Sequence, residues 1–156
     1  MTFFTGEPVC VWPAQAILGE GTVWSVRHQS LFWVDIYGCK LHQYNPKTQE
    51  KKSWLLEHQI TAVTERADSP KLLVSLRRHL AFFDLQSGEL ELLVEPEAGK
   101  YAKNRFNDGK CDAMGNFWCG TMNDDQDAAS GSFYVYTPEQ SIECKTEGYV
   151  VTNGPC

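Results

Sequence analysis

Short apolar or alternating runs follow one another along the chain, and Gly, Asn, Asp or Pro residues separate them. Helical periodicity is nearly absent, so this pattern predicts an all-β protein. The clearest runs come in three pairs, in which an apolar run is followed by a second strand-like run. These pairs occupy residues 31–36 with 40–46, 71–76 with 80–84, and 116–121 with 132–138.

A weaker strand precedes each pair and an outer strand follows it, which makes four strands per unit. The three units occupy residues 21–56, 60–95 and 109–147, and an insert at 123–130 lengthens the third. Four-stranded units with a period of about 40 residues are typical of β-propeller blades. A β-sandwich or a meander with the same number of strands is the alternative.

Three units of this kind cannot close into a ring, because propellers close with about 4–8 blades. A fourth blade is expected to begin at residue 150. We therefore expect a truncated chain, roughly the N-terminal half of a six-bladed propeller that is a monomer when complete. The alternative is a dimer, or another association of the half, that completes the ring.

Composition supports a folded domain, because the 156 residues are 42% hydrophobic and 12% aromatic. The net charge is -6 and the basic residues are scattered, which argues against nucleic-acid binding. No apolar run approaches the ~18 residues of a membrane span, and the N-terminal residues lack the features of a signal peptide. We expect a soluble, cytoplasmic protein with no nucleic-acid or membrane partner.

The cysteines are widely spaced and form no CxxC pair, which argues against a zinc knuckle. In a reducing compartment we expect them to be small, buried apolar residues, and a disulfide framework is the alternative. The cysteines are Cys10, Cys39, Cys111, Cys119, Cys144 and Cys156.

Residues 104–109, NRFNDG, hold the densest group of candidate binding side chains. Arg105, Asn107 and Asp108 supply a cation, an amide and a carboxylate beside Gly109. Such a group can bind an oxygen-rich ligand, since guanidinium and amide groups donate hydrogen bonds to hydroxyl and carbonyl oxygens. An Asn-Asp-Gly run is also typical of a tight turn, and the residues alone leave both interpretations open.

Five segments together resemble the SMP-30/gluconolactonase/regucalcin-like family. The similarity covers nearly the whole chain in order, and the bacterial sugar-acid lactonases of the xylonolactonase and arabinonolactonase types look most similar. The segments are LGEGTVW at 18–24, FWVDI at 32–36, NRFNDGKCDAMGNFWCGTM at 104–122, GSFYVY at 131–136 and TNGPC at 152–156.

The resemblance implies a six-bladed propeller with one divalent metal ion in its central channel. By motif, Glu20 and Asn153 match metal ligands. Without this resemblance, Glu20 would be interpreted as a loop residue and Asn153 as a turn residue. Arg105 and Asn107 match substrate-contacting residues, and Asp125 loosely matches an acidic substrate contact. The family's third metal ligand, an aspartate credited as the general base, would lie beyond the end of this sequence, so no catalytic residue is assigned here.

The implied metal is one of Ca, Zn, Mn, Mg or Fe(II). The hard oxygen ligands of Glu20 and Asn153 suit Ca, Mg, Mn or Fe(II), rather than a thiolate-type zinc site. The implied activity is carboxylic-ester hydrolysis, in which a sugar-acid lactone, the small-molecule partner, is opened to the free aldonic acid. The bound ion would polarise the lactone carbonyl. The alternatives are a calcium-binding regulatory propeller without significant turnover and an inactive truncated fragment.

Overall fold

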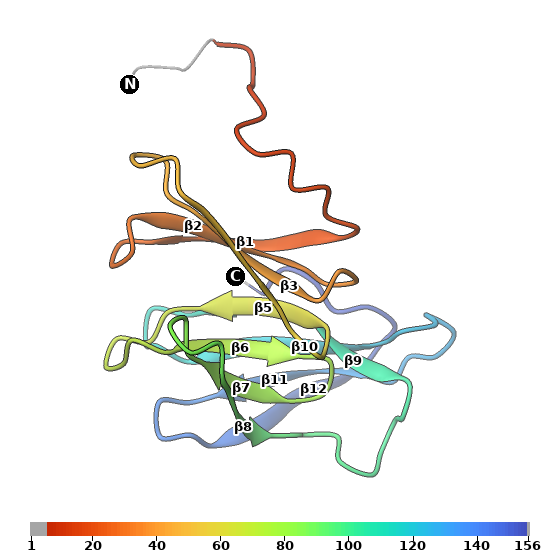
Figure 1. The fold of residues 1–156 in the computed structure, drawn as a ribbon. Helices are drawn as coiled ribbons and strands as arrows, with labels where there is room; N and C mark the ends of the chain where they lie inside the picture. The colour runs from red at the N-terminus through yellow and green to blue at the C-terminus, as the bar shows by residue number, and fades with distance from the viewer. Residues whose placement is uncertain (1–5, 156) are drawn as a thin grey trace.

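The structure is a computed structural model that describes residues 6–155, and these residues form three four-stranded antiparallel sheets (Figure 1). In each sheet the strands pair in chain order. The predicted all-β fold of four-stranded propeller blades is therefore confirmed. The first blade contains β1 (Gly19–Ser25), β2 (Ser30–Asp35), β3 (Lys40–Tyr44) and β4 (Lys51–Leu55). The second contains β5 (Ile60–Thr64), β6 (Leu72–Leu76), β7 (Leu80–Phe83) and β8 (Leu90–Val94), and the third contains β9 (Asn104–Cys111), β10 (Phe117–Asn123), β11 (Gly131–Tyr136) and β12 (Ile142–Tyr149).

Consecutive blades pack face to face, with the first blade at the top of Figure 1 and the other two below it. The first strands of neighbouring blades are in contact, β1 with β5 and β5 with β9, so these strands form the inner side of the stack. The second blade is buried on both faces. Along β6, Leu72 and Val74 pack in the core shared with the first blade, whereas Leu73 packs in the core shared with the third. Burial on both faces explains why every residue of β6 except Ser75 is apolar.

The third blade differs from its prediction, because β9 begins at Asn104 and not at Gly109. The tight-turn interpretation of residues 107–109 is therefore wrong. Arg105 pairs with Met122 across the β9–β10 ladder, and the Phe106 amide donates to the Arg77 carbonyl oxygen at 2.9 Å. Gly109 is required there by close packing, because a Cβ at this position would lie 2.4 Å from the Phe117 ring.

The cysteine expectation holds only for Cys119, which is buried and whose thiol pKa is raised by that burial. Cys10 and Cys144 are exposed, and every described cysteine is free. Cys144 faces solvent because β12 is the outer strand of its blade. Cys156 lies outside the described residues.

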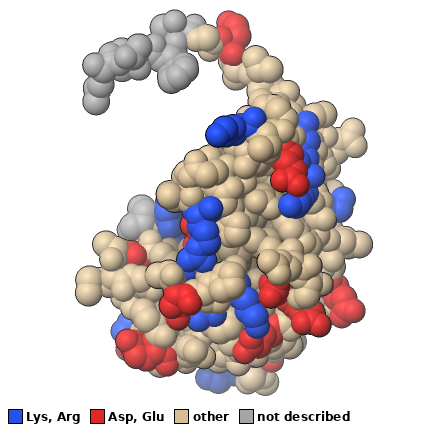
Figure 2. Space-filling model, turned by 60° about the vertical axis from the view of Figure 1, so that its left-hand side comes forward, with Lys and Arg blue, Asp and Glu red and all other residues tan. Residues whose placement is uncertain are grey.

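Lys and Arg side chains are interspersed with Asp and Glu on the face of the molecule in Figure 2. This face therefore carries no continuous basic surface of the type that follows a nucleic-acid backbone. In the described part of the chain, no helix is long and apolar enough to cross a bilayer.

Candidate functional site

Polar side chains from two blades meet at the end of the stack where the inner strands β5 and β9 begin. Arg105 and Asn107 project from β9, and Arg77 follows the end of β6. Gln59 immediately precedes β5. Hydrogen bonds join these residues across the boundary between the second and third blades, so they form one cluster.

Arg105 lies at the centre of this cluster, with a side chain that is only 3% exposed. Its Nε donates to Asp124 Oδ1 at 2.7 Å, and its Nη1 donates to Asn107 Oδ1 at 2.8 Å and to the Phe106 carbonyl oxygen at 3.0 Å. The structure gives Nη2 no hydrogen-bond acceptor among the described residues, and Nη2 is not one of the buried unpaired atoms. Arg105 is therefore a rigidly held guanidinium with two N–H groups available to a ligand.

Asp124 bridges Arg105 to a second arginine. Its Oδ2 accepts a hydrogen bond from Arg77 Nη1 at 2.8 Å, and the same nitrogen donates to Gln59 Oε1 at 2.9 Å. Partial burial acts to raise the pKa of Asp124, but the hydrogen bonds from Arg77 and Arg105 hold this pKa below its usual value. Asp124 is thus ionised at neutral pH and serves as the anchor of two guanidinium groups rather than as a proton donor.

Asn107 connects β9 to the segment that follows β12. Its Nδ2 donates to the Thr152 carbonyl oxygen at 2.6 Å and more weakly to Asn153 Oδ1 at 3.3 Å. Asp108 Oδ2 accepts from the Gly154 amide at 2.8 Å, and Thr152 Oγ1 donates to the Thr121 carbonyl oxygen at 3.0 Å. The structure thereby brings Arg105, Asn107 and Asn153 into one connected group.

The other two candidate residues lie apart from this group. Glu20 is an exposed residue on β1, opposite Val34 and next to Gly21, and no recorded contact joins it to Asn153 within the described residues. Asp125 points to the surface, where its Oδ2 lies 2.6 Å from Lys103 Nζ. The carboxylate that contacts Arg105 is the preceding residue, Asp124.

Asp124, Arg77 and Gln59 also belong to the cluster, and the sequence did not indicate them. Asp124 and Asp125 are adjacent and chemically identical, so the motif alone could not choose between them. Arg77 contacts Asp124 across 47 positions of sequence, and no local pattern signals that contact.

Glu20 and Asn153 are the two candidate residues that could bind a metal ion through side-chain oxygens. The Glu20 carboxylate and the Asn153 amide oxygen are hard donors, which suits Ca²⁺ or Mg²⁺ better than soft metals. Asn153 Oδ1 has one weak protein contact, so it retains a lone pair for a cation. Between residues 6 and 155, no three His, Cys, Asp or Glu side chains gather as a metal site. The chemistry therefore fits a hard cation, but these two residues supply only part of the roughly six to eight oxygens that Ca²⁺ takes.

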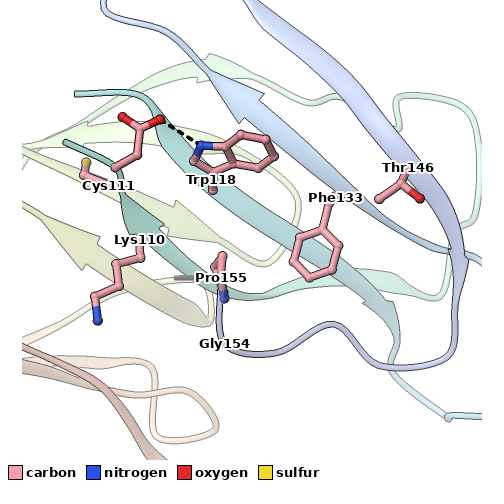
Figure 3. A pocket seen from close by; sticks show the side chains of 8 residues that line it. Lys110, Cys111, Trp118, Phe133, Thr146, Gly154 and Pro155 are labelled. Atoms are coloured by element: carbon pink, nitrogen blue, oxygen red, sulfur yellow. Dashed lines mark hydrogen bonds between the residues drawn. The ribbon is translucent and has the colours of Figure 1, made fainter. Parts of the chain in front are cut away.

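A separate hollow of about 380 Å³ lies on the third blade (Figure 3). Trp118, Phe133 and Pro155 line it, and none of the five candidate residues does. Asp112 is the carboxylate in the lining of this hollow. Hydrogen bonds from Asn116 and from Trp118 Nε1, which lies 3.0 Å from Asp112 Oδ2, lower the pKa of Asp112 to about 2. The Trp118, Phe133 and Pro155 side chains give this hollow an apolar wall, and it is distinct from the Arg105 cluster.

Gly120 sets the position of the segment that carries Asn153. A Cβ on Gly120 would lie 2.2 Å from Thr152 Oγ1 and 2.4 Å from Thr152 Cβ, and Thr152 is only 1% exposed. We expect Gly120→Ala to displace residues 152–154 and to lower the free energy of unfolding by about 1–3 kcal/mol, as overpacking does. Urea denaturation and the NMR shift of the Asn107 side-chain amide measure the two effects.

Gly19→Ala is the matched control for that variant, because its Cβ would meet only Ala16 Cβ at 3.4 Å. The control should unfold near the wild-type urea midpoint. A Gly120→Ala protein with wild-type stability and an unshifted Asn107 amide would contradict the assigned role of Gly120.

Comparison with known proteins identifies relatives of this fold. The family model described as SMP-30/Gluconolactonase/LRE-like region matches residues 18–156. An L-arabinolactonase from Azospirillum brasilense is 33% identical over 140 residues, which cover 88% of this chain and 46% of that protein. A 6-deoxy-6-sulfogluconolactonase from Pseudomonas putida is 31% identical over 145 residues, which cover 93% of this chain and 49% of that protein.

A solved structure agrees with these matches. Regucalcin from Agrobacterium tumefaciens, described as a calcium-binding protein, matches with a TM-score of 0.80 and 26% identity, over 86% of this chain and 45% of that chain. The chain spans about half the length of the curated relatives it matches. The family model covers nearly all of the sequence and the L-arabinolactonase is 33% identical, so the chain belongs to the SMP-30/gluconolactonase/LRE-like family.

Proposed function

We propose that the protein, at its full natural length, is a cytoplasmic enzyme that hydrolyses lactones of sugar acids to the free acids with the help of a divalent metal ion. The observation that carries this proposal is the buried Arg105 guanidinium, which Asp124 and Asn107 hold while Nη2 stays free for a ligand. A lactone is rich in carbonyl, ring and hydroxyl oxygens that such a donor binds. The lactonases among the relatives support the same assignment.

Each residue of the cluster has a role in this proposal. Arg105 Nη2 donates to an oxygen of the lactone and holds the substrate against β9. Asn107 accepts from Arg105 and donates to the Thr152 carbonyl oxygen, so it fixes the guanidinium relative to Asn153. Asp125, paired with Lys103 at the surface, would contact only a substrate that extends beyond the cluster.

Glu20 and Asn153 would hold the ion, which when bound polarises the carbonyl and lowers the pKa of water. In the hydrolysis the water oxygen bonds to the acyl carbon, the acyl–oxygen ring bond breaks, and the ring oxygen leaves as a hydroxyl after it takes a proton. The hydrogen bonds from Arg105 act on the substrate oxygens throughout this exchange. No general base is assigned among residues 6–155.

Metal removal tests the proposal. The full-length protein is stripped with a chelator and assayed with glucono- and arabinonolactones, alone and with Ca²⁺, Mg²⁺, Mn²⁺, Zn²⁺ or Fe²⁺, by the acid released. We expect a rate above spontaneous hydrolysis that disappears on stripping and returns with at least one metal. Hydrolysis at the spontaneous rate with every metal would refute the assignment.

A calcium-binding propeller without turnover is the second candidate. The similarity to a structure described as a calcium-binding protein favours it, as do the hard oxygen donors of Glu20 and Asn153. The same titration separates the two candidates, because a pure binder gives a Ca²⁺ binding isotherm with no metal-dependent rate on any lactone.

A further inference from the structure

Arg77 and Arg105 flank a single carboxylate. Arg105 Nε contacts Oδ1 of Asp124 and Arg77 Nη1 contacts Oδ2, at 2.7 and 2.8 Å. Because each guanidinium holds a different oxygen of the same carboxylate, the two arginines lie within the length of one six-carbon lactone. Arg77 is 36% exposed, and the structure gives its Nε and Nη2 no acceptor among the described residues.

The ion pairs recorded for Arg77 and Arg105 converge on one carboxylate, that of Asp124. Two guanidinium groups share one carboxylate, and their other side-chain partners, Gln59 and Asn107, are neutral. Neighbouring charges are occupied elsewhere, since Lys103 pairs with Asp125 and Asp127. Arg78 and Glu95 likewise pair with each other. The buried Glu97 carboxylate, which lines the same small hollow as both arginines and receives hydrogen bonds from neutral side chains, offsets the second guanidinium. Arg77 therefore presents unoccupied N–H groups, and not a surplus charge, beside the Arg105 donor.

We propose that Arg77 makes this site selective for sugar lactones that carry an anionic group, such as a carboxylate, phosphate or sulfonate, at the carbon farthest from the lactone carbonyl. This inference rests on the proposed lactone hydrolysis. Arg105 binds the oxygens near the reacting carbonyl, and the free face of Arg77 binds the distal anion through a planar two-nitrogen fork. A neutral lactone leaves that fork in water.

A matched substrate pair isolates this effect. Glucaro-1,4-lactone and glucono-1,4-lactone differ only at C6, which is a carboxylate in the first and a hydroxymethyl group in the second. We expect the full-length protein to show the lower KM for glucaro-1,4-lactone, and Arg77→Gln to reduce the ratio of the two kcat/KM values by about tenfold, the loss of one charge-assisted contact. Added salt should weaken the preference in wild type and have little effect on it in the variant.

Control variants distinguish a role of Arg77 in substrate specificity from a role only in holding the second and third blades together. Arg77→Lys keeps the charge but loses the fork, so its ratio should fall between those of wild type and Arg77→Gln. Arg27→Gln, which removes an exposed arginine bonded to backbone carbonyl oxygens of residues 66, 67 and 69, should leave the ratio unchanged. Equal kcat/KM values for the two lactones in wild type, or an equal loss on both in Arg77→Gln, would overturn the inference.

A binding measurement separates this inference from the proposed hydrolysis. Calorimetry with glucarate and gluconate compares a dianion with a monoanion and needs no turnover. Tighter glucarate binding that Arg77→Gln abolishes would support the anion site even if no lactone were hydrolysed, and then only the proposed function fails. Equal binding of the two acids would contradict the anion site.

Discussion

Replacing Arg105 with alanine is expected to lower kcat/KM on aldonolactones by roughly 100-fold, the size of effect seen when a preorganised donor to the reacting group is removed. The variant loses the free Nη2 donor and also the contacts that hold Asp124 and Asn107. Asp124 Oδ1 and Asn107 Oδ1 would each lose the donor that Arg105 supplies. Partly buried acceptors without a donor should lower the free energy of unfolding by about 1–3 kcal/mol. Arg105→Lys keeps the charge, but one ammonium cannot reach Asp124, Asn107 and a ligand together, so an intermediate loss is expected.

Steady-state kinetics on the full-length protein and urea denaturation measure these two effects separately. Arg27→Ala is the matched control, because Arg27 also makes three hydrogen bonds but lies in the β1–β2 turn, away from the cluster. Its kcat/KM should stay within about twofold of wild type, since surface changes are usually near neutral. An Arg105→Ala enzyme with wild-type kcat/KM would exclude Arg105 from substrate binding.

Most strands were predictable because their signal is local. The second predicted unit begins at residue 60, where β5 (Ile60–Thr64) begins, and β6 differs by one residue from the predicted run 71–76. Such buried strands are compact, mostly apolar runs between turn residues. The packing of blade on blade follows from the same pattern, because β6 and β7 carry apolar side chains on both faces and both faces must be covered.

β9 was cut short in the prediction because its first residues are polar. Asn104, Arg105 and Asn107 look like a solvated turn, yet Asn104 and Arg105 are buried. Their partners lie far away in sequence: Asn104 Nδ2 donates to Glu97 Oε2 and to the Ser130 carbonyl oxygen. A polar strand end that is satisfied by tertiary hydrogen bonds has no periodic signature, so only the folded chain reveals it.

Only some of the residues in the candidate site could be predicted from the sequence. The family motifs singled out Arg105, Asn107 and Asn153, and the structure connects these three residues. The position of the acidic partner depends on the turn after β10, where the Asp124 amide donates to the Lys103 carbonyl oxygen at 3.1 Å. That backbone contact directs Asp124 to Arg105 and leaves Asp125 with Lys103, a one-residue difference that sequence similarity does not resolve.

Glu20 is held by the backbone around it rather than by contacts of its own carboxylate. The amides of Ile17 and Leu18 donate to the buried Asp35 carboxylate at 3.1 and 2.9 Å, which fixes the chain where it enters β1. Gly21 has a φ of 61°, in the left-handed region that favours glycine, so this residue lets the backbone of β1 turn directly after Glu20. The backbone at Glu20 is thus fixed, so only the Glu20 side chain would lose conformational freedom on binding a cation.

Glu20→Ala is therefore expected to abolish metal-dependent lactone hydrolysis and to weaken divalent-metal affinity by more than about 100-fold. Loss of a residue that only hydrogen-bonds to a metal ligand already costs about 10–100-fold. Calorimetric metal titration and the chelator-and-refill assay measure the two effects on the full-length protein. Glu50→Gln is the control, since Glu50 is a surface residue that pairs with Lys52 at 3.0 Å, and its metal affinity should equal that of wild type. Undiminished metal binding in Glu20→Ala would remove Glu20 from the ligand set. Undiminished binding combined with lost turnover would instead assign Glu20 to the substrate, because a carboxylate beside the lactone can affect the reaction without holding the ion.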